Sequence, residues 1–420
     1  MKQLLFMISI SMVIITSNTQ AQISLTIEEC YKLARQNYPL VKQSGLLIKS
    51  AEYSVQNASK GYLPQLNING QATYQSDVTR IPLNLPGLNI PTLSKDQYRI
   101  YGEINQTVYD GGLINLLKKT QEVNSVIELQ KVEVELYKLK ERINQLYFGI
   151  LLVNEQLVQT ELIKTDMEQT LEKTKGAIKN GVALISNGEI LQVEILKISQ
   201  RTIELKATRK AFMDMLTLFI NQPVDENKRF EKPSSIVITN TINRPELLLF
   251  DHQKKMTDVQ SVFLVTRNLP KLALFLQGGY GRPALNALDN TFNFYYVGGV
   301  RLNWAISSIY TFNKDKAILE ISRSLIDLQK ETFLFNTQYT LQQQNAETTK
   351  LKQLIESDRE IIALRTKIKN TALVQLKNGV INTTDYLREL NAEDQALQTQ
   401  LFHDIQLLLA LYILQTTSGN

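Results

Sequence analysis

The sequence predicts a mainly α fold with a membrane-type β part: long antiparallel coiled-coil helical hairpins together with four strands per chain. Three observations predict it. The chain contains an internal tandem duplication, two very long segments without proline carry apolar residues at heptad spacing, and four segments of about ten residues alternate polar and apolar side chains. Period 3.5 is typical of packed helices and period 2 of strands, so both element types are predicted in each copy.

Residues 1–21 have the pattern of a secretory signal peptide. Lys2 supplies the positive charge, Leu4 to Ile15 form a short apolar run, and Thr19-Gln20-Ala21 is a small-x-small cleavage site. The run is shorter than the roughly 20 apolar residues of a membrane-spanning helix. We expect cleavage after Ala21.

Composition argues against several classes of protein. The formal net charge is +5, with 46 basic and 41 acidic residues interspersed and no basic stripe, so nucleic acid is not an expected partner. Cys30 is the single cysteine, so no disulfide can form within the chain. The two histidines lie far apart in the sequence, and no nucleotide-binding, zinc-binding or nucleophile motif occurs. We expect no enzyme activity, cofactor or metal.

The duplication divides the mature chain into residues 22–228 and 229–420. Leu63-Pro64 matches Leu269-Pro270 at an offset of 206, and Lys179-Asn180-Gly181-Val182 matches Lys377-Asn378-Gly379-Val380 at an offset of 198. The change of eight falls in the loop after the first strand. Each copy has the order short helix, helix, strand, loop, strand, very long helix, turn, helix.

The predicted strands, at about residues 62–76, 98–109, 269–281 and 292–305, have one apolar and one polar face. On the apolar face of the second strand we expect Ile100, Ile104 and Val108, interrupted by Gln106. The third strand has a weaker pattern, because Ala273 and Phe275 fall on its polar side. The residues expected to face a water-filled lumen are Asn67, Asn69, Gln71, Thr73, Arg99, Glu103, Asn105, Arg301 and Asn303.

Such strands suit a membrane β-barrel, with aromatic residues near the strand ends where interfacial girdles lie. A soluble sheet with one face on a core is the alternative. Four strands cannot close a barrel, and open sheet edges in lipid leave unpaired backbone groups. The strands therefore predict an oligomer, in which two copies would supply eight strands and three copies twelve.

The long helices are expected at about residues 113–179 and 309–377, and each would extend about 100 Å. Gly181 and Gly379 follow them where helices usually end, and returning helices are expected at about 187–220 and 383–415. Two antiparallel coiled-coil hairpins per chain result. A structural coiled-coil protein without a pore, periplasmic or on the cell surface, is the alternative reading of these hairpins.

The sequence resembles the TolC-like outer-membrane factor family over nearly the whole mature chain. The ordered motifs that carry this resemblance are Asn37-Tyr38-Pro39-Leu40, Val108-Tyr109-Asp110-Gly111-Gly112, Arg244-Pro245-Glu246-Leu247, the two Lys-Asn-Gly-Val turns and Thr384-Asp385-Tyr386-Leu387. The second strand exit, Ala305 to Ile309, lacks Asp-Gly-Gly, so we expect a different turn there.

The resemblance implies a homotrimer with a twelve-stranded β-barrel in the bacterial outer membrane and a helical α-barrel in the periplasm. It implies the exit duct of a tripartite efflux pump or type I secretion system, with a periplasmic adaptor and an inner-membrane pump as partners. The exported substrate cannot be read from these residues. The loop at 76–97 is expected to be external, and its role is open.

The resemblance also implies a gate at the periplasmic helix turns, including Gly181 and Gly379. Asp385 matches an acidic position of the family there, and Glu189 is its expected counterpart in the first copy, preceded by two extra residues. Arg388 stands where many relatives carry a second acid, so rings of Asp385 and Arg388 would compensate each other in charge. Alternatively, Asp385 is a cap or first-turn acid of the returning helix.

Overall fold

The computed structural model describes residues 24–79, 93–234 and 241–420. The expected signal peptide and most of the loop at 76–97 lie outside the described residues. The chain divides into two compact units, and each copy of the duplication contributes to both. The sheet unit contains residues 39–138, 239–343 and 415–420, and the hairpin unit contains residues up to 38, 139–238 and 344–414.

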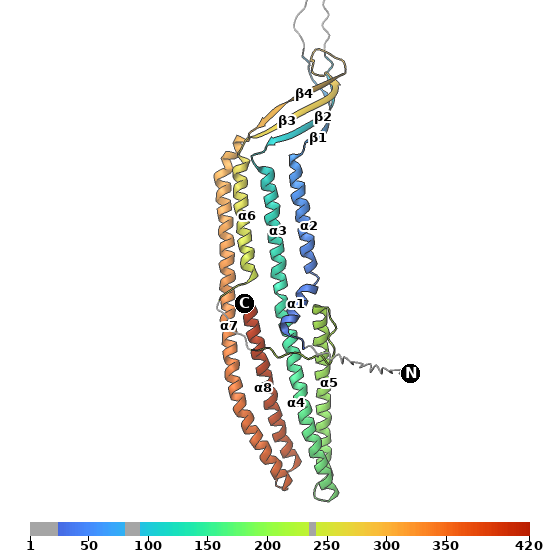
Figure 1. Cartoon of the computed structure of the whole chain (residues 1–420), viewed down its shortest axis with the longest axis vertical. Coiled ribbons are helices and arrows are strands. Elements are labelled where there is room, and N and C mark those ends of the chain that lie inside the picture. Colours follow the sequence, from blue (N-terminus) through green and yellow to red (C-terminus); the bar gives the residue numbers. More distant parts are fainter. Residues whose placement is uncertain (1–23, 80–92, 235–240) are drawn as a thin grey trace, which may run out of the picture. The chain divides into compact units, whose positions relative to one another are not determined.

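The sheet unit holds the four strands and the helices that adjoin them (Figure 1). Its elements are α2 (Val41–Ser59), η1 (Lys60–Tyr62), β1 (Gln65–Tyr74), β2 (Asp96–Tyr109), α3 (Leu113–Tyr137), α6 (Pro245–Arg267), β3 (Lys271–Arg282), β4 (Asn293–Asn303), η2 (Ile306–Ser308) and the first part of α7 (Ile309–Lys377). Helix α3 contacts α2 and α6. The strands form one antiparallel sheet in the order β1-β2-β3-β4, so β1 and β4 are its edges.

The hairpin unit consists of α1 (Ile27–Asn37), α4 (Leu139–Lys179), α5 (Ile185–Ile220), the second part of α7 and most of α8 (Thr383–Ser418). Apolar side chains of α4 pack with those of α5 and α8 around Tyr147, Phe148 and Leu216. A second cluster near the helix turns joins Met167, Leu191 and Tyr386. The predicted fold class, long helices with a four-stranded antiparallel sheet, is confirmed. The expected helix at 113–179 is divided into α3 and α4 at Lys138.

In the described parts of the chain, no helix combines the length and apolar character needed to cross a bilayer.

The duplication recurs in the contacts around the two Asn-x-Pro motifs. Asn37 donates its side-chain amide to the carbonyl of Ile220 at the end of α5. Its counterpart Asn243 donates its backbone N–H to the carbonyl of Ser418 at the end of α8. In each copy, the returning helix therefore ends against the start of the same copy.

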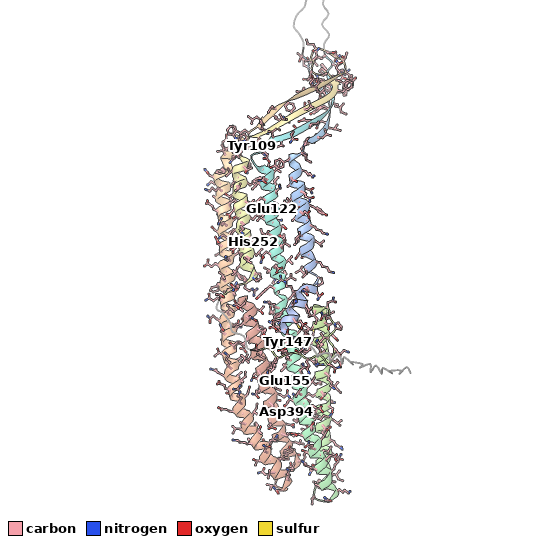
Figure 2. The ribbon with its side chains drawn as sticks, viewed as in Figure 1. Tyr109, Glu122, Tyr147, Glu155, His252 and Asp394 are labelled. Atoms are coloured by element: carbon pink, nitrogen blue, oxygen red, sulfur yellow. The ribbon has the colours of Figure 1, made fainter. Side chains whose placement is uncertain are left out.

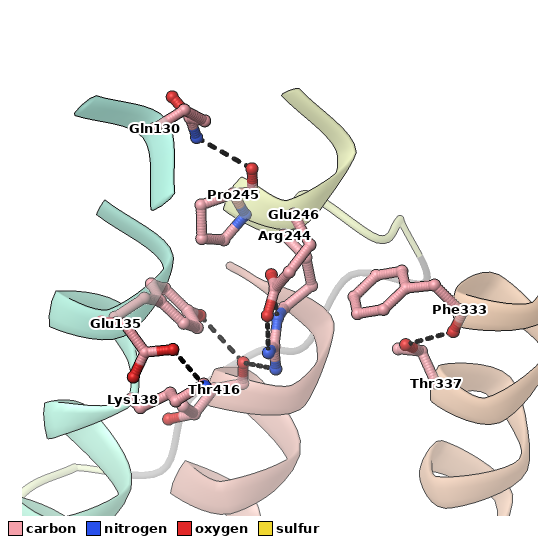
Figure 3. Close-up of polar contacts among 10 residues, drawn as sticks. Gln130, Glu135, Lys138, Arg244, Pro245, Glu246, Phe333, Thr337 and Thr416 are labelled. Carbon is pink, nitrogen blue, oxygen red and sulfur yellow. Dashed lines mark hydrogen bonds and ion pairs between the residues drawn. The ribbon is translucent and has the colours of Figure 1, made fainter. Parts of the chain in front are cut away.

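The residue after each asparagine contacts aromatic rings. Tyr38 stacks on Phe219 at a ring distance of 6.3 Å. Its counterpart Arg244 lies 5.1 Å from the Tyr137 ring and binds the Glu246 carboxylate through two nitrogens (Figure 3). The two copies thus use different chemistry at equivalent positions.

Tyr147 joins three segments of the hairpin unit at its core (Figure 2). Its hydroxyl oxygen lies 2.7 Å from the carbonyl oxygen of Leu25 and 2.6 Å from that of Glu231. Leu25 in turn forms a parallel bridge with Phe230. Burial raises the pKa of Tyr147 above its ordinary value, so the phenol stays protonated and can donate to these carbonyls.

We expect Tyr147→Phe to lower the free energy of unfolding by about 1–2 kcal/mol, because the hydrogen bonds from the hydroxyl to the carbonyls of Leu25 and Glu231 are lost. Denaturant unfolding followed by circular dichroism measures the change. Tyr53→Phe is the control, since Tyr53 is 61% exposed and should tolerate the substitution. Equal stability of the two variants would contradict the role assigned to the buried hydroxyl.

Candidate functional site

The register of the sheet places all nine residues that we expected to face a lumen on one face. Asn67 lies opposite Glu103 and Gln71 opposite Arg99, and β3 continues the same face to Arg301 of β4. Residues opposite each other in antiparallel strands share a face. We call this odd-numbered side the polar face. Besides the nine, it carries Gln65, Gln97, Tyr101, Thr107, Lys271, Ala273, Phe275, Gln277, Gly279, Gly281, Asn293, Tyr295, Val297 and Gly299.

The opposite, even-numbered side is almost entirely apolar and strongly exposed, and we call it the apolar face. Ile68 is 77% exposed, Tyr74 79%, Phe294 86% and Tyr296 78%. In water, exposed apolar area of this extent is unfavourable, and it usually marks a surface that another apolar phase or partner covers.

The end of β2 differs from our expectation for Val108. The register shifts between Thr107 and Tyr109, so that Tyr109 rather than Val108 lies opposite Leu272 on the apolar face. A β-bulge inserts one residue and changes which side chains alternate. Gln106 does interrupt the apolar face, and its side-chain amide donates to the carbonyl of Tyr62.

Glu103 is the centre of a polar network across three strands. It is 8% exposed and accepts hydrogen bonds from Asn105 (2.7 Å), Gln277 (2.7 Å) and Arg301 (3.0 Å). Arg301 also lies 4.6 Å from the centre of the Phe275 ring. A carboxylate with three donors and an adjacent cation is compensated in both charge and hydrogen bonding.

Glycines accommodate the large side chains of the polar face. A Cβ on Gly279 would lie 2.6 Å from the Cβ of Tyr101 and 3.0 Å from the Tyr295 ring. A Cβ on Gly299 would lie 3.2 Å from the Phe275 ring. Phe275 lies on the polar side of β3, where an aromatic ring was not expected to face a water-filled lumen. Its ring covers Gly299 and contacts Arg301. The roles of Gln277 and Phe275 in this network were not predicted, although both residues stand at odd positions of β3.

The two strand exits are built differently, as the sequence predicts. Asp110 accepts hydrogen bonds from the N–H groups of Gly112 (2.8 Å) and Ile114 (2.6 Å), and it caps α3. Gly111 and Gly112 have φ of +69° and +89°, values that favour glycine. In the second copy, the 3₁₀ turn η2 replaces this cap.

The two helix turns of the hairpin unit share one backbone conformation. Gly181 and Gly379 have φ of +74° and +70°. The N–H of Val182 donates to the carbonyl of Ala177, and that of Val380 to Gln375, both at 2.9 Å. These are Schellman-type helix ends, for which glycine is the preferred residue.

Asp385 lies in the first turn of α8, and Asn382 supplies the cap by accepting the Asp385 N–H at 2.9 Å. Arg388 lies 3.8 Å from Asp385 and donates to Glu389 at 3.1 Å. With residues of α7, these side chains line a groove of about 560 Å³. Arg388 thus lies beside two carboxylates of its own helix, those of Asp385 and Glu389.

Glu189 is not the positional counterpart of Asp385. Helix α5 begins at Ile185 and α8 at Thr383, each four residues after its turn glycine, so no extra residues precede Glu189. Asn187 corresponds to Asp385, and Glu189 lies two residues further along and is exposed. At this position the first turn therefore carries a neutral amide and the second a carboxylate.

Ion pairs between helices explain acidic residues within the apolar seams. Asp394 (Figure 2), which interrupts the seam of α8, pairs with Arg201 of α5 at 3.1 Å. Glu393 pairs with Lys369 of α7 at 2.8 Å. In the sheet unit, the antiparallel helices α6 and α7 are joined by four ion pairs, Asp251–Lys330, Lys254–Asp327, Asp258–Arg323 and Arg267–Asp315.

The first part of α7 also presents an exposed apolar stripe. Its members follow heptad spacing and are exposed: Ile318, Ile321, Leu325, Leu328, Thr332, Phe335 and Tyr339. The apolar members are 54–70% exposed. On α2, Leu46 and Tyr53 are exposed one heptad apart. Heptad stripes of this kind are typical of helices that pack against another helix.

Among the described residues, no group of three or more histidine, cysteine, aspartate or glutamate side chains is arranged to hold a metal ion.

Comparisons with solved structures establish the fold. The transmembrane channel protein CusC superimposes with a TM-score of 0.66 at 14% identity, over 94% of this chain and 92% of that chain. The outer membrane channel MtrE of Neisseria gonorrhoeae, in its open state, gives 0.64 at 14% identity, over 94% and 89%. The outer membrane protein VceC of Vibrio cholerae gives 0.62 at 12% identity, over 93% and 96%.

The sequence matches no family model and no curated protein sequence. The resemblance to TolC-like proteins is confirmed in the fold, which this chain shares with the three proteins over nearly its whole length.

Proposed function

We propose that the chain is one subunit of an outer-membrane channel, the exit duct of a tripartite efflux pump or type I secretion system. The observation that carries the proposal is the sheet, whose register gathers a continuous exposed apolar face and a continuous polar face. The apolar face suits contact with lipid, and the polar face suits a water-filled lumen.

The open sheet supports an oligomer. Strands β1 and β4 are edges, and in lipid their unpaired backbone groups cost several kcal/mol each unless β4 of one copy pairs with β1 of the next. The stripe on α7 offers a helical interface in the same unit. Three copies, as in the family that the sequence resembles, would form a twelve-stranded barrel and a helical duct.

Exposed apolar residues at the helix turns support partners in the periplasm. Val182 is 78% exposed and Ile185 70% at the first turn, and Val380 is 69% exposed at the second turn, next in sequence to Ile381, which lines the groove of Asp385 and Arg388. We propose that an adaptor protein binds these turns and that the duct opens when neighbouring hairpins separate. An adaptor drives this opening only if it binds the open state better than the closed one.

Planar-bilayer conductance of the detergent-purified protein tests the function. The wild type should give small, mostly closed conductance, and Asp385→Ala combined with Arg388→Ala should raise it severalfold by removing charges at the turn. Glu128→Ala with Lys131→Ala is the control, because it removes an exposed ion pair of α3 that belongs to the sheet unit.

Each outcome is informative. Conductance that the turn variant leaves unchanged would keep the duct and reject the gate at Asp385 and Arg388. Absence of conductance, in protein that dissolves without detergent, would reject the channel in favour of a structural coiled coil.

A further inference from the structure

Four charged residues lie on the polar face of the sheet: Arg99, Glu103, Lys271 and Arg301. Glu103 and Arg301 form an ion pair at 3.0 Å and cancel. Arg99 and Lys271 form no ion pair with any residue that the structure describes. The polar face of one chain therefore carries two uncompensated positive charges.

The residues that the register pairs with the two cations are neutral. Gln71 and Gly281 flank Arg99 on the neighbouring strands, and Asn303 lies opposite Lys271. The arginine is exposed, and its stem passes over Gly281, where a Cβ would come within 2.9 Å of the Arg99 Cγ. The absence of a side chain at Gly281 thus leaves room for the arginine stem against the sheet.

The apolar face contributes no net charge. Its charged residues within the four strands are Asp96 and Arg282, which form an ion pair. The guanidinium of Arg282 also lies 5.6 Å from the Tyr98 ring and 5.2 Å from the Phe292 ring. The excess of positive charge in the sheet is thus confined to the polar face.

We infer that the barrel favours anionic solutes, with Arg99 and Lys271 as the residues that set this preference. The inference rests on the proposed function, in which the polar face borders water. Three copies would place six uncompensated cations around one lumen. A cleft or pore lined by one sign of charge within low-dielectric walls raises the local concentration of the opposite ion.

Reversal potentials across a bilayer with a KCl gradient test this inference. At about 0.01 M ionic strength the Debye length is roughly 30 Å, so fixed charges act across the lumen. We expect chloride to permeate roughly threefold more readily than potassium through the wild type. Arg99→Gln with Lys271→Gln should bring the ratio close to one, while the step conductance of open pores shows that the variant still assembles.

Glu103→Gln with Arg301→Gln is the matched control, because it removes one charge of each sign from the same face. This variant should keep the anion preference. A wild type that prefers potassium would overturn the inference, as would a chloride preference that survives in the Arg99 and Lys271 variant. Loss of the preference in the control as well would overturn the assignment to these two residues. A wild type that gives no conductance at all would reject the proposed duct itself, and this outcome is distinguishable from a change in ion preference.

Discussion

Aspartate at both Leu325 and Leu328 should leave each chain folded but prevent its assembly into oligomers. Both leucines belong to the exposed stripe of α7, with 54% and 57% of their surface accessible in the single chain. The substitutions therefore remove little packing within the chain. In a helical interface they would bury two carboxylates per copy without cationic partners, at a cost of order 3 kcal/mol each.

Light scattering coupled to size-exclusion chromatography in detergent measures the assembly. The wild type should elute as an oligomer and the variant as a single chain with unchanged circular dichroism. Ser324→Asp with Gln338→Asp is the control, since both residues are exposed on α7 outside the stripe. An oligomer that survives the leucine substitutions would show that the stripe does not form the interface.

The fold could be predicted because its local signals agree with one another. The offsets of 206 and 198 anticipated equivalent elements, and the helix turns at Gly181 and Gly379 proved to share one hydrogen-bond pattern. Alternation alone also separated the polar and apolar sides of β1 and β4. A glycine turn and a period of two are properties of neighbouring residues, so they can be read without knowledge of tertiary contacts.

The details of the site depend on partners that are distant in the sequence. Glu103 and Arg301 were both expected to face a lumen, but their ion pair follows from the pairing of β2 with β3 and of β3 with β4. The bulge that displaces Val108 has no signal in the alternation pattern. The ion pair of Asp394 likewise depends on Arg201, which lies on another helix. Register and bulges are set by tertiary pairing, which a single sequence does not contain.

The second large effect is expected at Arg244, where four segments of the sheet unit meet (Figure 3). The guanidinium binds Glu246 through Nε and Nη2, donates from Nη1 to the carbonyl of Thr416 at 3.4 Å, and lies over the rings of Tyr137 and Phe333. The side chains of Arg244 and Glu246 are only 18% and 12% exposed. Removing the arginine leaves the mostly buried carboxylate of Glu246 without the partner that binds both of its oxygens.

We expect Arg244→Ala to lower the free energy of unfolding by about 2–4 kcal/mol, and Arg244→Lys to lose roughly half of that, because lysine keeps the charge but not the planar fork. Trp304, the only tryptophan, belongs to the same unit, so its fluorescence during guanidinium unfolding reports this change.

Lys138→Ala is the control for Arg244, because the nearby Glu135–Lys138 pair is about half exposed, at 55% and 54%. Exposed pairs of this kind contribute about 0.5 kcal/mol or less. If Arg244→Ala and Lys138→Ala shifted the unfolding midpoint equally, the contacts of Arg244 would have no more weight than a surface ion pair. A larger shift for Arg244→Ala would show that this side chain strengthens the junction between the start and the end of the second copy, where the first copy stacks Tyr38 on Phe219.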